Sequence, residues 1–154
     1  MDALCPVRAL PCRGGRDTAE TLLHAAAAWG QLEMVRELLK RGASVDLQTS
    51  LGWTALMNAA CGGHLSVVLV LLQHSASIDL QSNIGGTALM EAAEEGYEAC
   101  LKALLRAKAN TDLQNIDGVT ALMKAAYGGH EACVQALLRA KANTELLDKD
   151  GDTA

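Results

Sequence analysis

The side chains of this chain that are best suited to chemistry are its cysteines and histidines. They are Cys5, Cys12, Cys61, Cys100, Cys133, His24, His64, His74 and His130. A cysteine beside a histidine can act as a thiol nucleophile, and a group of such residues can bind zinc. The sequence contains no Cys-x-x-Cys pair and no glycine-rich phosphate loop. Whether any of these side chains can meet therefore depends on the elements that carry them.

Those elements recur every 33 residues along the chain. The period is set by the threonines Thr21, Thr54, Thr87, Thr120 and Thr153. Each of the first four threonines is followed, at constant distances, by a leucine, a pair of alanines, a glycine and a pair of leucines. A period of this length predicts a stack of small units, each of which packs only against its neighbours.

Each unit is predicted to be a pair of short helices followed by a tight turn. In the second unit, Thr54 can cap a first helix that ends at residues 62–63, and His64 opens a second helix. The apolar stripe of this second helix is Val67, Val68, Leu71 and Leu72. The turn holds a column of glycines, expected at positive φ, that consists of Gly52, Gly85, Gly118 and Gly151. The predicted fold is all-α, a solenoid of stacked helix-turn-helix units with short β-hairpin-like turns.

The stack keeps the chemically capable side chains apart. His64 and His130 share one column two units apart, which corresponds to roughly 16–20 Å when packed helices lie about 8–10 Å apart. Zinc ligands lie within about 2.3 Å of one ion, so these two histidines are not expected to share a metal. Cys100 and Cys133 share a column that holds methionine or valine elsewhere, which indicates a core position. We therefore expect no catalytic residue, no metal and no cofactor.

The composition agrees with thin, closely packed helices. Half of the residues are hydrophobic, only 3% are aromatic and phenylalanine is absent, so alanine and leucine must form the core. A net charge of −5 disfavours nucleic acid as a partner, since its phosphates are bound mainly by basic side chains. No apolar run reaches the roughly 18–20 residues of a membrane span. The odd number of cysteines argues against a disulfide scaffold and favours the cytoplasm or nucleus.

Residues 1–16 are expected to be a disordered arm. A secretory signal needs a basic start and an uninterrupted apolar stretch of roughly 7–15 residues, but here Asp2 comes first and Pro6 and Pro11 interrupt the run. Its arginines leave organelle targeting open as an alternative.

The segment that follows resembles the ankyrin repeat. Residues 52–64 read Gly-Trp-Thr-Ala-Leu-Met-Asn-Ala-Ala-Cys-Gly-Gly-His, and the family pattern is Thr-Pro-Leu-His-x-Ala-Ala, then Gly-His and a Leu-Leu pair. The resemblance covers residues 17–154. It divides the chain into four repeats at about 17–48, 49–81, 82–114 and 115–147, with the start of a fifth at 148–154. By analogy, the column histidines should hydrogen-bond the turn and support a helix start.

The chain departs from the family pattern in three columns, one of which holds Met57, Met90 and Met123 in place of the family's histidine. Alanine replaces the family's proline at Ala55, Ala88, Ala121 and Ala154, and the glycine after the second helix survives only as Gly42. That glycine is replaced by Ser75, Lys108 and Lys141. If these residues adopt the left-handed conformation, each costs about 1 kcal/mol relative to glycine.

The two ends of the array are expected to differ. The second helix of the first repeat is the most charged of the four, as suits an outer face. The last seven residues begin the motif without its helices, so we interpret the chain as a piece of a longer array. A partner that covers the far side of the fourth repeat is the alternative.

The resemblance implies a non-catalytic protein–protein interaction module, an adaptor or scaffold, that binds through turn tips and the concave face of the first helices. The candidate partner-binding residues are Trp29, Ser50, Leu51, Trp53, Asn83, Ile84, Glu94, Glu95, Ile116, Asp117, Val119 and Tyr127. Three of them are aromatic, and tryptophan and tyrosine are enriched among residues that dominate binding energy. The alternative is that these aromatic rings cover neighbouring alanines and extend a thin core.

We expect the partner to be a protein and this chain to be a monomer. Neither nucleic acid nor a membrane is expected as a partner. Glu91, Glu94, Glu95 and Glu98 form an acidic patch that could attract a basic segment, or could simply be a solvated face.

Two other functions stay open. One is a fragment or spacer without its own partner. The other is a small inhibitor of a kinase, as some four-repeat ankyrin proteins are, although that would require a distorted first helix in the second repeat.

Overall fold

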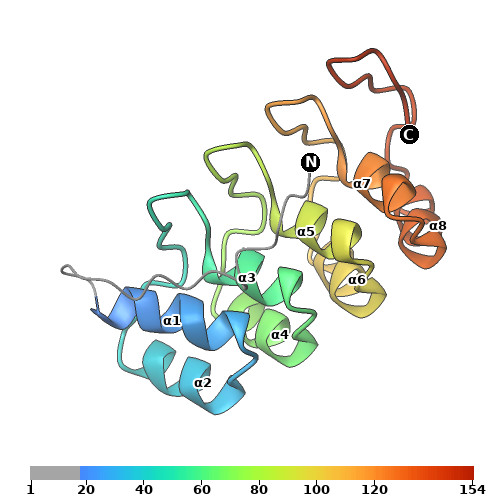
Figure 1. Ribbon diagram of the computed structural model, residues 1–154. Coiled ribbons are helices and arrows are strands. Elements are labelled where there is room, and N and C mark those ends of the chain that lie inside the picture. Colours follow the sequence, from blue (N-terminus) through green and yellow to red (C-terminus); the bar gives the residue numbers. More distant parts are fainter. Residues whose placement is uncertain (1–17) are drawn as a thin grey trace.

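The computed structural model describes residues 18–154, and in this part of the chain it contains eight helices and no strand (Figure 1). The helices are α1 (Thr18–Ala28), α2 (Leu32–Lys40), α3 (Ala55–Cys61), α4 (Leu65–Gln73), α5 (Ala88–Glu95), α6 (Glu98–Arg106), α7 (Ala121–Tyr127) and α8 (Glu131–Arg139). The arm expected at residues 1–16 lies outside the described residues. No helix in the described part is long and apolar enough to cross a membrane.

The helices form pairs that stack in a row, and a hairpin turn projects from the same side of each pair (Figure 1). First helices pack against first helices, in the order α1, α3, α5 and α7, and second helices form a parallel row of α2, α4, α6 and α8. Each hairpin is closed by a backbone hydrogen bond, as from Ser82 N to Gly86 O at 2.8 Å. The all-α solenoid with hairpin-like turns that the sequence predicts is confirmed.

The first helices begin where the threonine column predicts. Thr54 Oγ1 accepts a hydrogen bond from Met57 N at 3.2 Å, and Thr87 and Thr120 do the same at 3.3 Å for the residues three positions later. These bonds satisfy backbone N–H groups that would otherwise lack a partner at a helix start. The first repeat differs, because α1 begins at Thr18 and therefore contains Thr21 within the helix.

The core consists of alanine and leucine, with a few methionines, valines and cysteines. Leu71, Leu104 and Leu137 are fully buried, as are the alanine pairs of α3 and α5. Cys100 and Cys133 are buried and free, and burial raises the pKa of the Cys100 thiol to about 11. The prediction that these two cysteines occupy core positions is confirmed. In the second helix of the second repeat, Val70 is buried as well, although it lies outside the predicted stripe.

The predicted left-handed residues are also confirmed. Gly42 has a φ of 85°, and the residues that replace it in the later repeats, Ser75, Lys108 and Lys141, have φ values of 63°, 71° and 63°. A side chain in this conformation is strained because its Cβ approaches the following carbonyl. Each of the last three repeats therefore carries a small backbone penalty at the end of its second helix.

Hydrogen bonds between repeats fix their spacing. His64 Nε2 lies 3.0 Å from Ala28 O, and His130 Nε2 lies 2.8 Å from Glu94 O. These histidines are expected to hydrogen-bond the turn, and each bonds a carbonyl near the end of the first helix in the preceding repeat, which has no partner within that helix. A glutamine column adds a second link, since Gln81 Nε2 donates to Gln114 O at 3.2 Å in the next repeat.

The outer faces of the first and fourth repeats are unlike. On α2 the charged side chains are exposed, and two of its glutamates pair with arginines, as in Arg41 Nε to Glu37 Oε1 at 2.8 Å. On the fourth repeat, Ala126 is exposed although its counterparts Ala60 and Ala93 are fully buried by the following repeat. The hairpin at 148–152 is nevertheless formed, with Asp148 N donating to Asp152 O at 3.0 Å.

Candidate protein-binding surface

The hairpin tips form a ridge with exposed apolar side chains. Leu51, Ile84 and Ile116 are 61%, 54% and 67% exposed. Neighbouring hairpins are joined through their backbones, because Asn83 N donates to Leu51 O and Ile116 N donates to Ile84 O, both at 3.0 Å. These bonds tie neighbouring tips together, and ordering of this kind before binding reduces the entropy that binding must overcome.

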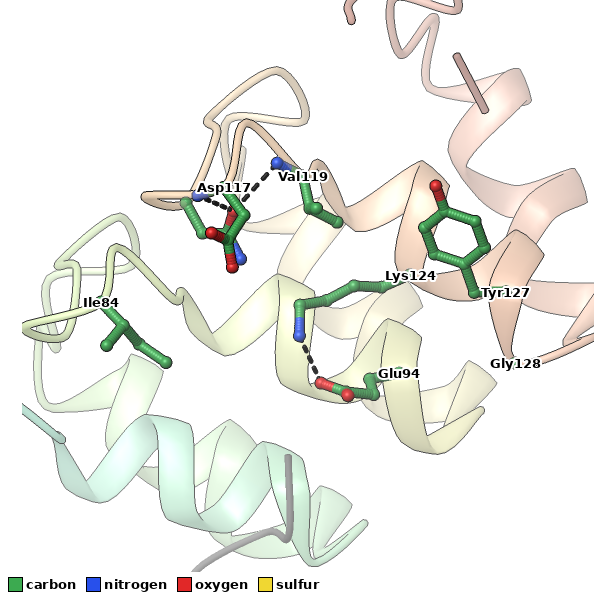
Figure 2. Close-up of a pocket in the computed structure, with 8 residues that line it drawn as sticks. Ile84, Glu94, Asp117, Val119, Lys124, Tyr127 and Gly128 are labelled. Carbon is green, nitrogen blue, oxygen red and sulfur yellow. Dashed lines mark hydrogen bonds and ion pairs between the residues drawn. The ribbon is translucent and has the colours of Figure 1, made fainter. Parts of the chain in front are cut away.

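Below the ridge, a groove of about 400 Å³ lies between the third and fourth repeats (Figure 2). Its lining residues come from two hairpins and from α5 and α7, and they are Ile84, Glu94, Asn115, Asp117, Val119, Lys124, Tyr127 and Gly128. We call this site the α5–α7 groove. Figure 2 shows Lys124 reaching from α7 toward Glu94 on α5, with Val119 above and Tyr127 farther along α7.

Charges in the α5–α7 groove are largely paired. Lys124 Nζ forms an ion pair with Glu94 Oε2, and the two side chains are 15% and 31% exposed. Lys149 pairs in the same way with Asp117 across neighbouring hairpins. Both lysines near the groove are therefore engaged by carboxylates of the preceding repeat.

Glu91 lies beside the Lys124–Glu94 ion pair, and the pKa of its carboxyl is raised. Burial raises the pKa of the Glu91 carboxyl to about 7; the Lys124 ammonium opposes this shift, while the carboxylates of Glu94 and Glu95 add to it. The cause is that a charged carboxylate loses hydration when it is removed from water. The chain thus places an acid that titrates near neutral pH next to the groove.

Tyr127 presents an exposed ring at the edge of the groove. Its side chain is 65% exposed, and its hydroxyl donates a hydrogen bond to Asp148 Oδ2 at 3.2 Å. This bond raises the pKa of the Tyr127 hydroxyl, and the nearby carboxylates of Asp148, Asp152 and Asp150 contribute in the same direction. The ring is held in place by the hydroxyl while its face remains available for contact.

The structure brings together only part of the predicted set. Five of the twelve candidates line the α5–α7 groove, namely Ile84, Glu94, Asp117, Val119 and Tyr127. Ser50, Leu51, Asn83 and Ile116 lie along the ridge outside it, and Glu95 is exposed beside it. The groove also includes Asn115, Lys124 and Gly128, which the site prediction omitted. Of these three, Lys124 could have been noticed in the sequence, because it occupies the same repeat column as Glu91.

The aromatic candidates other than Tyr127 differ in their exposure to solvent. Trp29 is 55% exposed and lies just after α1, far along the chain from the groove. Trp53 is half-buried and packs against the core, which favours the packing alternative for this residue.

Of the acidic patch, Glu98 pairs with Lys102 within α6 and so belongs to the row of second helices. Among residues 18–154 no three His, Cys, Asp or Glu side chains are arranged to hold a metal ion.

Comparison with known proteins gives one finding. A family model described as ankyrin repeats in three copies matches residues 22–115 and again residues 89–154. A search of curated proteins gave no match.

Proposed function

We propose, from the premise that this chain belongs to the ankyrin-repeat family, that it is a non-catalytic adaptor or scaffold that binds a protein partner through its hairpin tips and first helices. Ankyrin repeats are in general protein–protein interaction modules. The cytoplasmic or nuclear location, the monomeric state and the division into four repeats with the start of a fifth are parts of the same proposal.

The observation that carries the proposal is the exposed apolar ridge. Leu51, Ile84 and Ile116 contribute little to folding where they stand, because more than half of each side chain remains in water. Clustered exposed apolar side chains mark interaction surfaces more often than single ones do. Backbone hydrogen bonds link the hairpins that carry the cluster, and Ile84 also lines the α5–α7 groove.

The kinase-inhibitor alternative receives no support from the second repeat. Its first helix, α3, has a regular threonine cap and spans seven residues, as α7 does in the fourth repeat. The distortion that this alternative requires is therefore not seen in α3.

The test is an affinity capture from cell extract with quantitative mass spectrometry. The double variant Ile84→Ser, Tyr127→Ser removes two exposed apolar contacts at the groove and should lose the partners that the wild type retains. The matched control is Leu69→Ser, which removes a side chain of similar exposure from α4, in the row of second helices. A partner list that is the same for all three proteins would refute the proposed surface, and an empty list for the wild type would favour a spacer.

A further inference from the structure

The α5–α7 groove carries information about the kind of segment that it can bind. This inference rests on the proposed function, because it assumes that the groove faces a partner. Three features of the groove bear on it: its apolar side chains, the balance of charge around it, and the surroundings of Glu91.

The apolar side chains lie at two edges of the groove. Ile84 stands on the hairpin at 82–86 and Tyr127 at the end of α7, and both are more than half exposed. Val119 lies between them on the hairpin at 115–119 and is partly buried. A partner segment that spans the groove can therefore place apolar side chains at both edges.

Carboxylates outnumber ammonium groups around the same groove. The acidic residues are Glu91, Glu94, Glu95, Asp117, Asp148, Asp150 and Asp152, and the basic residues are Lys124 and Lys149. Both lysines already form ion pairs, with Glu94 and Asp117. The remaining negative charge favours a partner that brings positive charge of its own.

Glu91 is the acid that such a charge would reach. From its own helix it faces Glu94 and Glu95, and from α7 it faces Lys124, which is paired with Glu94. From the hairpin at 82–86 it faces Gly86, where an added Cβ would lie 3.0 Å from Glu91 Oε1. The equivalent positions in the neighbouring repeats hold Trp53 and Val119, whereas Gly86 places no side chain over the Glu91 carboxyl.

We propose that the α5–α7 groove binds an extended segment of a partner protein in which a lysine or arginine is flanked by apolar residues. The cation pairs with Glu91 and Glu95, beside the ion pair of Lys124 and Glu94. The flanking apolar side chains contact Ile84 on one side and the Tyr127 ring on the other. Since a bound cation requires an ionised Glu91, binding tightens as the pH rises through about 7.

The probe is a short synthetic peptide that alternates lysine and leucine, titrated into the isotopically labelled full chain and followed by NMR. Two matched peptides replace every lysine by glutamate or every leucine by serine. We expect the lysine–leucine peptide alone to shift the amide signals of Ile84, Glu94, Val119 and Tyr127, and to bind several-fold more weakly in high salt.

The deciding variant is Glu91→Gln, which keeps the shape of the side chain and removes its charge. At pH 8 we expect it to bind the lysine–leucine peptide about fivefold more weakly, and at pH 5.5 to match the wild type, in which Glu91 is then protonated. The control is Glu131→Gln, the same charge change at an exposed position on α8, which should leave the affinity unchanged at both pH values.

The outcomes separate this inference from the proposed function. If the glutamate peptide shifts the groove signals and the lysine peptide does not, the partner's charge is wrong while the surface stands. If the lysine peptide binds the groove equally well in Glu91→Gln, the placement of the cation is wrong. If both peptides shift only signals in the row of second helices, the surface and the inference both fail.

Discussion

Replacing Lys108 by glycine should stabilise the array. Lys108 has a φ of 71° and is exposed after α6, so the substitution removes a strained Cβ without removing a packed side chain. The left-handed conformation costs an ordinary residue roughly 1–2 kcal/mol, and glycine adds about 0.5–1 kcal/mol of entropy to the unfolded chain. The net gain is about 0.5–1 kcal/mol. Lys141→Gly should add a similar amount, since the two sites lie in different repeats and share no partner.

The assay is urea unfolding followed by circular dichroism. With a slope of about 2 kcal/mol per molar urea, Lys108→Gly should raise the midpoint by about 0.3–0.5 M. The matched control is Ala107→Gly, one residue earlier, where the φ is −80° and glycine brings only its entropy cost, so the midpoint should fall. Equal effects of the two substitutions would refute the reasoning, because they would show that the backbone at residue 108 carries no strain.

Other predictions concern charge, caps and the links between repeats. The folded-state pKa of Glu91, about 7, lies above its ordinary value of 4.5, so its protonated form stabilises the fold and this contribution is lost as the pH rises between these values. Glu91→Gln should therefore match the wild type near pH 4.5 and exceed its free energy of unfolding by roughly 2–3 kcal/mol at pH 8, measured by urea unfolding at both pH values. Thr87→Ala should cost about 1 kcal/mol by removing the cap of α5, whereas Thr144→Ala, at an exposed position, should cost almost nothing in the same assay. His130→Ala should cost about 1–2 kcal/mol because Glu94 O loses its hydrogen bond, and His74→Ala, at the exposed end of α4, serves as its control.

The fold could be predicted from the sequence because each column of the repeat has a local physical reason. A threonine before an alanine-rich segment caps a helix, and a glycine column at a tight turn indicates positive φ. The same reasoning identified the strained replacements of Gly42, because the column fixed the backbone conformation even where the residue type disagreed. Burial of Cys100 and Cys133 followed in the same way, from what the column accepts in other repeats.

The candidate site was less accessible to such reasoning, because it depends on contacts between repeats. The repeat column of Trp53 fixes the position of its Cα. Whether the ring packs against the core depends on the neighbouring side chains, and here it does. The ion pair of Lys124 and Glu94 joins residues 30 positions apart in different columns, so no comparison within a column reveals it. The histidine bonds to the preceding repeat were missed for the same reason.

The most direct test of the proposed binding surface is photo-crosslinking in cells. A photoreactive amino acid is introduced at position 84, on the ridge above the groove, and in a second protein at position 69, on α4. If the ridge and groove bind the partner, position 84 crosslinks to a defined protein and position 69 does not. Crosslinking of the same proteins from both positions, or from position 69 alone, would contradict it.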